Sequence, residues 1–118
     1  MKTLIMGAST NPERYAFKAA HSLLEHGHEI ELVGQKEGEI AGNKIKTDYP
    51  DFNNIDTVTM YVGPRNQPNL YDYILKQKPR RIIFNPGAEN SEFKQLAQLQ
   101  GIETEDACTL VLLATGQF

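Results

Sequence analysis

Short runs rich in apolar residues recur along the chain and predict five β-strands. They lie at residues 4–6, 29–33, 56–62, 81–84 and 102–105. The first run, Leu4 to Met6, has no polar alternation, which is typical of a strand buried on both faces of a parallel sheet. Glycine or a glycine-proline pair follows the first three runs, at Gly7, Gly34 and 63–64, and marks where they end.

Between these strands, apolar residues recur at the three- and four-residue spacing of amphipathic helices. This spacing predicts helices over residues 15–26, 68–77, 91–100 and 107–114. The first helix begins at Tyr15, or already at Pro12 with Asn11 as its N-cap. Gly27 follows it as a left-handed C-cap.

The alternation of strands and helices predicts an α/β fold: a three-layer parallel sheet of five strands with helices on both faces. Because crossovers between parallel strands are right-handed, we expect the strand order 3-2-1-4-5. Residues 37–47 are polar and punctuated by glycine. We expect an irregular loop there, packed through Ile40 and Ile45, in place of a crossover helix. One domain over residues 1–118 accounts for the whole pattern.

Ligands of such sheets bind at the carboxyl ends of the strands, where the crossovers diverge. In the predicted order this point lies between the first and fourth strands. The strand ends that meet there carry small, proline or amide residues. The candidate binding residues are Gly7, Ala8, Ser9, Thr10, Asn11, Arg14, Gln35, Lys36, Val62, Asn85, Pro86 and Gly87.

Two features of these candidates favour a phosphorylated ligand. The loop after Gly7 leads into a helix, whose free N–H groups suit a phosphate. Arg14 stands at the helix entrance, where the helix dipole disfavours a cation, so either a bound anion accompanies it or it is a solvated surface arginine. The second strand ends in Gln35 and Lys36 instead of the acidic residue that binds an NAD ribose. A phosphorylated ribose suits that lysine better.

Composition narrows the class of protein. The chain has 118 residues, of which 40% are hydrophobic and 23% are charged, as in an ordinary globular domain. No apolar run approaches the length of a membrane span, and a strand begins almost at the first residue, so we expect neither membrane anchor nor signal peptide. A single cysteine leaves no internal disulfide, and together these features indicate a cytoplasmic protein. The net charge of −3 argues against a nucleic-acid partner.

The same residues resemble a known family. The segments 6–14, 23–29, 38–44 and 85–87 are similar to those of small bacterial CoA-binding domain proteins, and residues 33–35 and 61–64 to the CoA-binding domain of succinyl-CoA ligase alpha subunits. The resemblance covers essentially the whole chain and implies a Rossmann-like fold that holds coenzyme A. It implies phosphates near Gly7, Ser9, Asn11 and Arg14, another beside Lys36, and the rest of the ligand along Val62 and 85–87. Gly34-Gln35 departs from the Asn-Pro common in the family, and Val62-Gly63 stands where arginines are frequent.

The candidates for chemistry are few. His21, His26 and His28 are expected at the surface, Cys108 as a buried and inert thiol, and Glu89 and Glu92 as helix-starting residues. Tyr61, Tyr71 and Tyr73 suit either adenine stacking or packing. We find no triad, metal-ligand cluster or P-loop.

The sequence therefore predicts a cytoplasmic protein that binds coenzyme A or an acyl-CoA without catalysis, as a carrier, sensor or partner module. Two alternatives use the same crevice: an NADP-dependent oxidoreductase and a vestigial interaction domain. A protein partner is left open.

Overall fold

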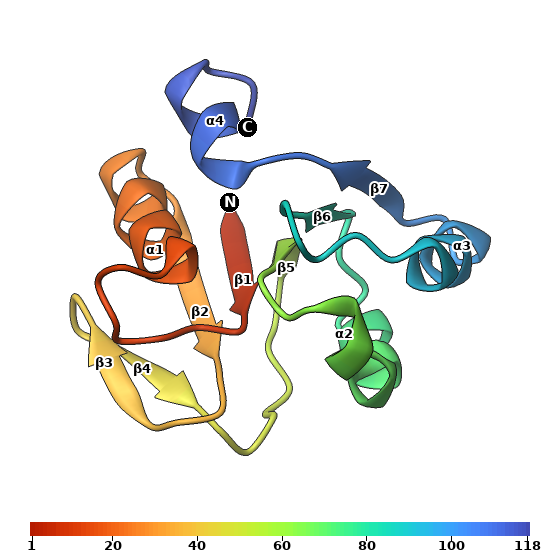
Figure 1. Cartoon of the computed structure of the whole chain (residues 1–118), viewed down its shortest axis with the longest axis horizontal. Helices are drawn as coiled ribbons and strands as arrows, with labels where there is room; N and C mark the ends of the chain where they lie inside the picture. The colour runs from red at the N-terminus through yellow and green to blue at the C-terminus, as the bar shows by residue number, and fades with distance from the viewer.

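A seven-stranded sheet runs through the molecule (Figure 1); the structure is a computed structural model that describes all 118 residues. Its strands are β1 (Lys2–Met6), β2 (Glu29–Val33), β3 (Gly38–Ile40), β4 (Asn43–Lys46), β5 (Ile55–Met60), β6 (Arg81–Phe84) and β7 (Glu103–Asp106). They lie in the order β3-β4-β2-β1-β5-β6-β7. Every pair is parallel except β3 with β4.

The expected count of five strands is wrong, because residues 37–47 form a hairpin and not an irregular loop. Ala41 and Gly42 both have positive φ, 49° and 82°, as a tight two-residue hairpin turn requires. Alanine is an unusual residue at such a position, which explains why the turn is hard to recognise in the sequence. Ile40 and Ile45 are buried, as expected, and fix the hairpin to the core.

The expected strand order is wrong in one assignment. The expected order 3-2-1-4-5 puts residues 56–62 next to the second strand, but β5 pairs with β1 on the side opposite to β2. The edge of β2 is already taken by β4, which pairs with it in parallel. When the parallel strands alone are counted, the order becomes 3-2-1-4-5-6, the order of the Rossmann fold. The crevice therefore lies between β1 and β5, not between β1 and β6.

Helices cover both faces of the sheet and complete three layers (Figure 1). α1 (Tyr15–Glu25) and α4 (Thr109–Ala114) pack on one face, and α2 (Tyr71–Lys76) and α3 (Ser91–Leu99) on the other. The turns η1 (Pro64–Asn66) and η2 (Pro68–Leu70) precede α2, so only the second half of the helix predicted over 68–77 is α-helical. None of the helices has the length and apolar content needed to cross a bilayer.

The central strand β1 divides the core. Leu4 and Met6 face a cluster shared with α2 and α3, whereas Ile5 faces a cluster shared with α1 and α4. All three side chains are at most 1% exposed, as the unbroken apolar run predicts. This packing holds the carboxyl end of β1 rigid, and the candidate site begins at that end.

Candidate functional site

A cavity of about 1020 Å³ opens at the carboxyl ends of β1, β2 and β5. It is lined by residues 6–10, 13–16, 33–36, 61–63, 65–66 and 69–70, together with Tyr49 and Pro86. Its volume is at the upper end of the range for small-molecule sites, so it has room for a long ligand. The cavity lies at the switch point of the sheet, where α/β folds of this kind bind their ligands.

Most of the candidates from the sequence meet in this cavity. Gly7, Ala8, Ser9, Thr10, Arg14, Gln35, Lys36, Val62 and Pro86 line it. Asn11, Asn85 and Gly87 lie outside its lining. The structure thus brings together the ends of β1, β2 and β5 as expected, but contributes little from the end of β6.

The loop from Gly7 to Arg14 is held mainly by its own backbone and short side chains. The N–H groups of Gly7 and Ala8 both donate to Val33 O, at 2.9 Å each. Asn11 N donates to Ser9 Oγ at 3.1 Å, and Glu13 N to Asn11 Oδ1 at 3.0 Å. Asn11 therefore shapes the loop from outside the cavity.

The first helix begins at Tyr15, so the alternative start at Pro12 is wrong. Arg14 is the N-cap residue, and its side chain makes no capping hydrogen bond. The first N–H groups of a helix have no partner within it. Because Arg14, Tyr15 and Ala16 all line the cavity, this positive helix end faces the space in which a ligand would lie.

Glycines bring the second strand against this loop. A Cβ on Gly34 would collide with Ala8 O, and a Cβ on Gly38 would collide with Thr10 Cγ2. Gly7 has a φ of 92°, and a Cβ there would lie 3.1 Å from the carbonyl carbon of Tyr61. Gly7 thus permits close packing of β1 against the residue after β5, a role in the fold that is separate from ligand approach.

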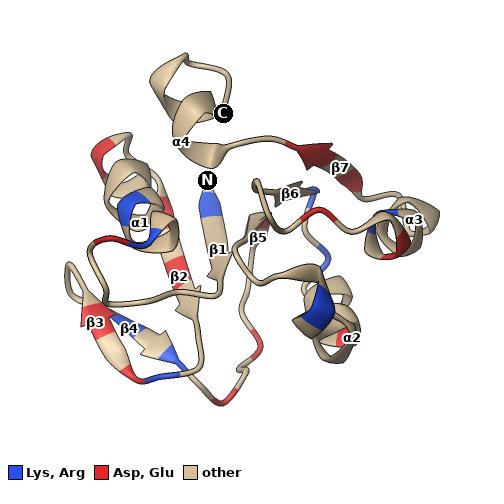
Figure 2. Ribbon diagram, viewed as in Figure 1, with Lys and Arg blue, Asp and Glu red and all other residues tan.

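Three cations surround the cavity without partners. Arg14, Lys36 and Arg65 are exposed and line it, and none of them belongs to an ion pair. Figure 2 shows these basic segments at the start of α1, between β2 and β3, and just before α2. Glu13 is the one carboxylate of the lining, so positive charge is in local excess in a chain of net charge −3, which favours a ligand with several negative groups.

Arg65 was missed by the sequence analysis, which noted only that Val62-Gly63 replaces the arginines frequent after the third strand in the family. Pro64 begins the turn η1, which carries the next residue back to the cavity. An arginine directly after a Gly-Pro strand end was the available signal.

A buried glutamine joins the two loops on the far side of the cavity. Gln67 is fully buried, and its Nε2 donates to Val62 O at 2.9 Å and to Ala88 O at 2.8 Å. Its Oε1 accepts from Asn90 Nδ2 at 2.9 Å. This side chain therefore links the segment after β5 to the segment after β6. A glutamine in a polar stretch gives no sequence signal of such burial.

Asn85 has a similar structural role. Its Nδ2 donates to Thr59 Oγ1 at 2.7 Å and to Met60 O at 2.9 Å, and its Oδ1 accepts from Thr109 N at 2.9 Å. These bonds tie β5, β6 and α4 together and use the amide fully. Of the predicted segment 85–87, only Pro86 reaches the cavity.

The tyrosines divide into packing and lining residues. The ring of Tyr71 stacks on Phe93, and Tyr73 donates its hydroxyl to Pro50 O at 2.6 Å; neither lines the cavity. Tyr61 lines it, but its hydroxyl is buried without a partner, and burial raises the pKa of this group to about 12. Tyr49, which the sequence analysis did not single out, also lines the cavity.

The histidines and the cysteine lie outside the cavity lining. His28 is half-buried against the ring of Phe118, contrary to its expected surface position, and desolvation lowers its pKa. Cys108 is half-exposed as the N-cap residue of α4, and not buried as expected.

Solved structures show the same fold over nearly the whole chain. An uncharacterised protein is 49% identical, with a TM-score of 0.97 over 99% of this chain and 97% of that one. A hypothetical protein from Pyrococcus horikoshii is 25% identical, with a TM-score of 0.83 over 92% of this chain and 78% of that one. A protein from Thermus thermophilus is 20% identical with a TM-score of 0.87, over 99% and 90% of the two chains. No curated protein matches the sequence.

The family assignment comes from the sequence as a whole. Residues 1–114 match the CoA binding domain, a span that includes every strand, the loop after Gly7 and the three unpaired cations. This match confirms the resemblance seen in the sequence motifs. The chain belongs to the CoA-binding domain family.

Proposed function

We propose that this protein binds coenzyme A, or an acyl-CoA, in the cavity between the ends of β1, β2 and β5. One observation carries the proposal: Arg14, Lys36 and Arg65 line a cavity of about 1020 Å³ and have no anionic partner in the protein. Coenzyme A bears a diphosphate and a phosphate on its ribose, so its anionic groups complement three separated cations. Membership of the CoA-binding domain family supports the same ligand.

In this proposal each part of the ligand contacts a different part of the cavity lining. The diphosphate lies over residues 7–10 and the start of α1, between Arg14 and Arg65. The ribose phosphate lies beside Gln35 and Lys36, where an NAD-binding sheet would carry an acid. The pantetheine chain runs along Val62 and Pro86, and its amides meet the side chains of Asn66 and Asn69.

We also propose that the protein holds this ligand without transforming it, as a carrier, sensor or partner module in the cytoplasm. The histidines and Cys108 lie away from the cavity, and Tyr61, with its raised pKa, keeps its proton at neutral pH. These observations favour holding over acid–base or nucleophilic work at the site.

NADP is the alternative ligand. Both NADP and coenzyme A carry a phosphate on a ribose, and Lys36 suits either of them equally. The two ligands differ beyond the diphosphate, where NADP has a flat nicotinamide and coenzyme A a thin, flexible chain. A vestigial interaction domain would bind neither ligand.

A calorimetric and thermal-shift panel with coenzyme A, acetyl-CoA, NADP, NAD and ATP tests the proposal. A ligand at one hundred times its Kd stabilises the fold by about 2.7 kcal/mol, which is a shift of several degrees for a chain of this size. We expect this shift with coenzyme A. A shift with NADP alone would replace the proposed ligand, and no shift with any nucleotide would favour the vestigial domain.

Charge variants locate the ligand. We expect Arg14→Met and Arg65→Met each to weaken coenzyme A binding by about ten- to hundredfold, since a hydrogen bond to a charged group contributes about 1.5–3 kcal/mol. Lys44→Met is the matched control, because Lys44 is exposed and unpaired but lies outside the cavity. Equal losses in all three variants would show a net-charge effect in place of a site.

A further inference from the structure

We propose that Tyr49 is the base-stacking residue of this site, with its ring packed against the adenine of the bound nucleotide. This inference rests on the proposed function, since it needs a ligand that carries adenine. It assigns a role to an aromatic residue that lies in a part of the chain, the link between β4 and β5, from which no binding residue was expected.

Three tyrosines line the cavity, and they differ in how much of each side chain is exposed and in what contacts it. The hydroxyl of Tyr61 points into the protein, where it is buried. Tyr15 is 65% exposed, and the ammonium of Lys18 lies over its ring, 5.4 Å from the ring centroid. Tyr49 is 44% exposed and contacts one other ring, that of Tyr73. Tyr15 is the more exposed of the two, but it stands at the start of α1, where the proposed diphosphate lies, whereas Tyr49 follows β4 at the side of the cavity that carries Gln35 and Lys36.

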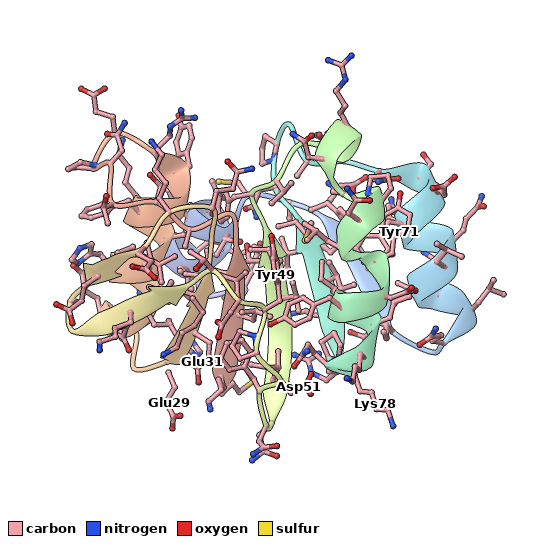
Figure 3. All side chains as sticks on the ribbon, turned by 90° about the horizontal axis from the view of Figure 1, so that it is seen from below. Glu29, Glu31, Tyr49, Asp51, Tyr71 and Lys78 are labelled. Atoms are coloured by element: carbon pink, nitrogen blue, oxygen red, sulfur yellow. The ribbon has the colours of Figure 1, made fainter.

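The contact with Tyr73 holds the Tyr49 ring without covering it. The ring centroids lie 5.4 Å apart at an interplanar angle of 79°, an edge-to-face arrangement. Whichever ring supplies the edge, at least one face of Tyr49 remains free. Tyr73 is itself fixed by the hydrogen bond from its hydroxyl to Pro50 O. Figure 3 shows Tyr49 over the middle of the sheet, well apart from Tyr71, which lies on α2.

The backbone at Tyr49 is strained. Its φ is 52°, in the left-handed region that costs a residue with a side chain roughly 1–2 kcal/mol and that glycine or asparagine tolerates better. Strain of this kind concentrates at ligand sites, where the surrounding structure holds a residue for its function. Ala41, Asn54 and Lys78 also have positive φ but lie outside the cavity lining, so Tyr49 differs from them in that its strained backbone holds a ring beside the cavity.

The register of the sheet places Tyr49 at the ribose end of the site. β4 runs parallel to β2, with Lys46 opposite Val33. The residues that follow the two strands, Gln35 and Lys36 on one side and Tyr49 on the other, therefore line the same end of the cavity. In dinucleotide-binding sheets the end of the second strand contacts the ribose, so the base lies just beyond it. The proposal therefore places the adenine at this end, against the ring of Tyr49.

Isothermal titration separates stacking from a structural role. We expect Tyr49→Asn to weaken coenzyme A binding by about five- to hundredfold, the range for loss of one base–aromatic stack. Tyr49→Phe keeps the ring and should stay within about threefold of the parent. The affinity for 4′-phosphopantetheine, which lacks the base, should not change in either variant. An equal loss for both ligands in Tyr49→Asn would assign a structural role and overturn the inference.

Two further readouts keep the test decisive. Asparagine suits a left-handed backbone, so the melting temperature of Tyr49→Asn without ligand should not fall below that of the parent. The chain has no tryptophan, so Tyr49→Trp introduces a single reporter whose fluorescence stacked adenine should quench, whereas 4′-phosphopantetheine should not. Unchanged coenzyme A affinity in Tyr49→Asn, or no quenching in Tyr49→Trp, overturns the role of Tyr49 but leaves the proposed function standing. If the parent protein binds no nucleotide at all, both the role of Tyr49 and the proposed function are overturned.

Discussion

The two walls of the cavity are built in different ways. The wall from Gly7 to Arg14 is fixed by backbone hydrogen bonds to Val33 and by glycines that let strands approach it. The opposite wall, which carries Val62 and Pro86, is held by one fully buried side chain, that of Gln67. A wall held by backbone hydrogen bonds keeps its structure when its exposed side chains are substituted. A wall held by one side chain loses its structure when that residue is substituted. Substitutions can therefore break each wall separately.

Gly34→Ala should have the largest effect, because it breaks the first wall. The added Cβ would collide with the carbonyl oxygen of Ala8, a backbone atom that cannot rotate away. We expect a loss of about 2–3 kcal/mol in the free energy of unfolding, the upper part of the range for overpacking. Urea denaturation followed by circular dichroism measures it.

Gly63→Ala is the matched control. Gly63 has a φ of −62°, and a Cβ there would meet nothing within 4 Å. An ordinary backbone and open space predict a neutral effect or a gain of about 0.4–1 kcal/mol from the less flexible unfolded chain. If Gly34→Ala were as stable as Gly63→Ala, the close packing of β2 against the loop would not matter.

Gln67→Leu should break the second wall at a cost of about 2 kcal/mol, because it removes the donors to Val62 O and Ala88 O from a buried site. Unlike Gly34→Ala, it should raise hydrogen exchange mainly in residues 62–70 and 85–90. The measurement is amide exchange by mass spectrometry, peptide by peptide.

Gln67→Glu refines this comparison, since it keeps an acceptor for Asn90 Nδ2 and loses both donors. If the two donated bonds hold the loops together, it should behave like Gln67→Leu. Raised exchange in Gln67→Leu but not in Gln67→Glu would show that the third bond, not the link between the loops, holds this wall.

The same contrast explains how much the sequence predicted. The first wall follows from local rules: an unbroken apolar strand, a glycine, and a helix with its alanine stripe are all visible in consecutive residues. The three layers, the loop after Gly7 and the cation at Lys36 could therefore be predicted. The family match over residues 1–114 confirms the predicted resemblance to CoA-binding domain proteins.

The parts that could not be predicted depend on contacts between distant residues. The Ala41-Gly42 turn lacks the usual asparagine, so the hairpin and the place it takes beside β2 were missed, and the order of the remaining strands shifted with it. Asn85 looked like a ligand contact because it ends a strand, but its amide is used by Thr59 and Thr109. A polar residue at a strand end does not reveal whether it faces the ligand or the core.

Asn11→Ala should have a smaller effect, since it removes one side-chain bond from the backbone-built wall. The N–H of Glu13 would lose its acceptor, and we expect a cost of about 0.5–1 kcal/mol, as for loss of a capping residue. Because Asn11 lies outside the cavity lining, the affinity for coenzyme A should fall by less than in Arg14→Met. An equal or larger loss of affinity would mean that Asn11 contacts the ligand directly.

Tyr61→Phe should have the smallest effect at neutral pH and one that grows with pH. The Tyr61 hydroxyl is buried without a hydrogen-bond partner, and burial raises its pKa from 10.0 to about 12. The folded protein therefore holds this proton more tightly than the unfolded chain, so the stability of the parent falls as pH rises from 10 towards 12. Phenylalanine has no proton to lose and no unpaired buried hydroxyl, so the variant should equal or slightly exceed the parent at pH 7 and lose less stability above pH 10. Melting temperatures of both proteins from pH 7 to 11 measure the difference. Parallel curves would show that folding does not raise the pKa of Tyr61.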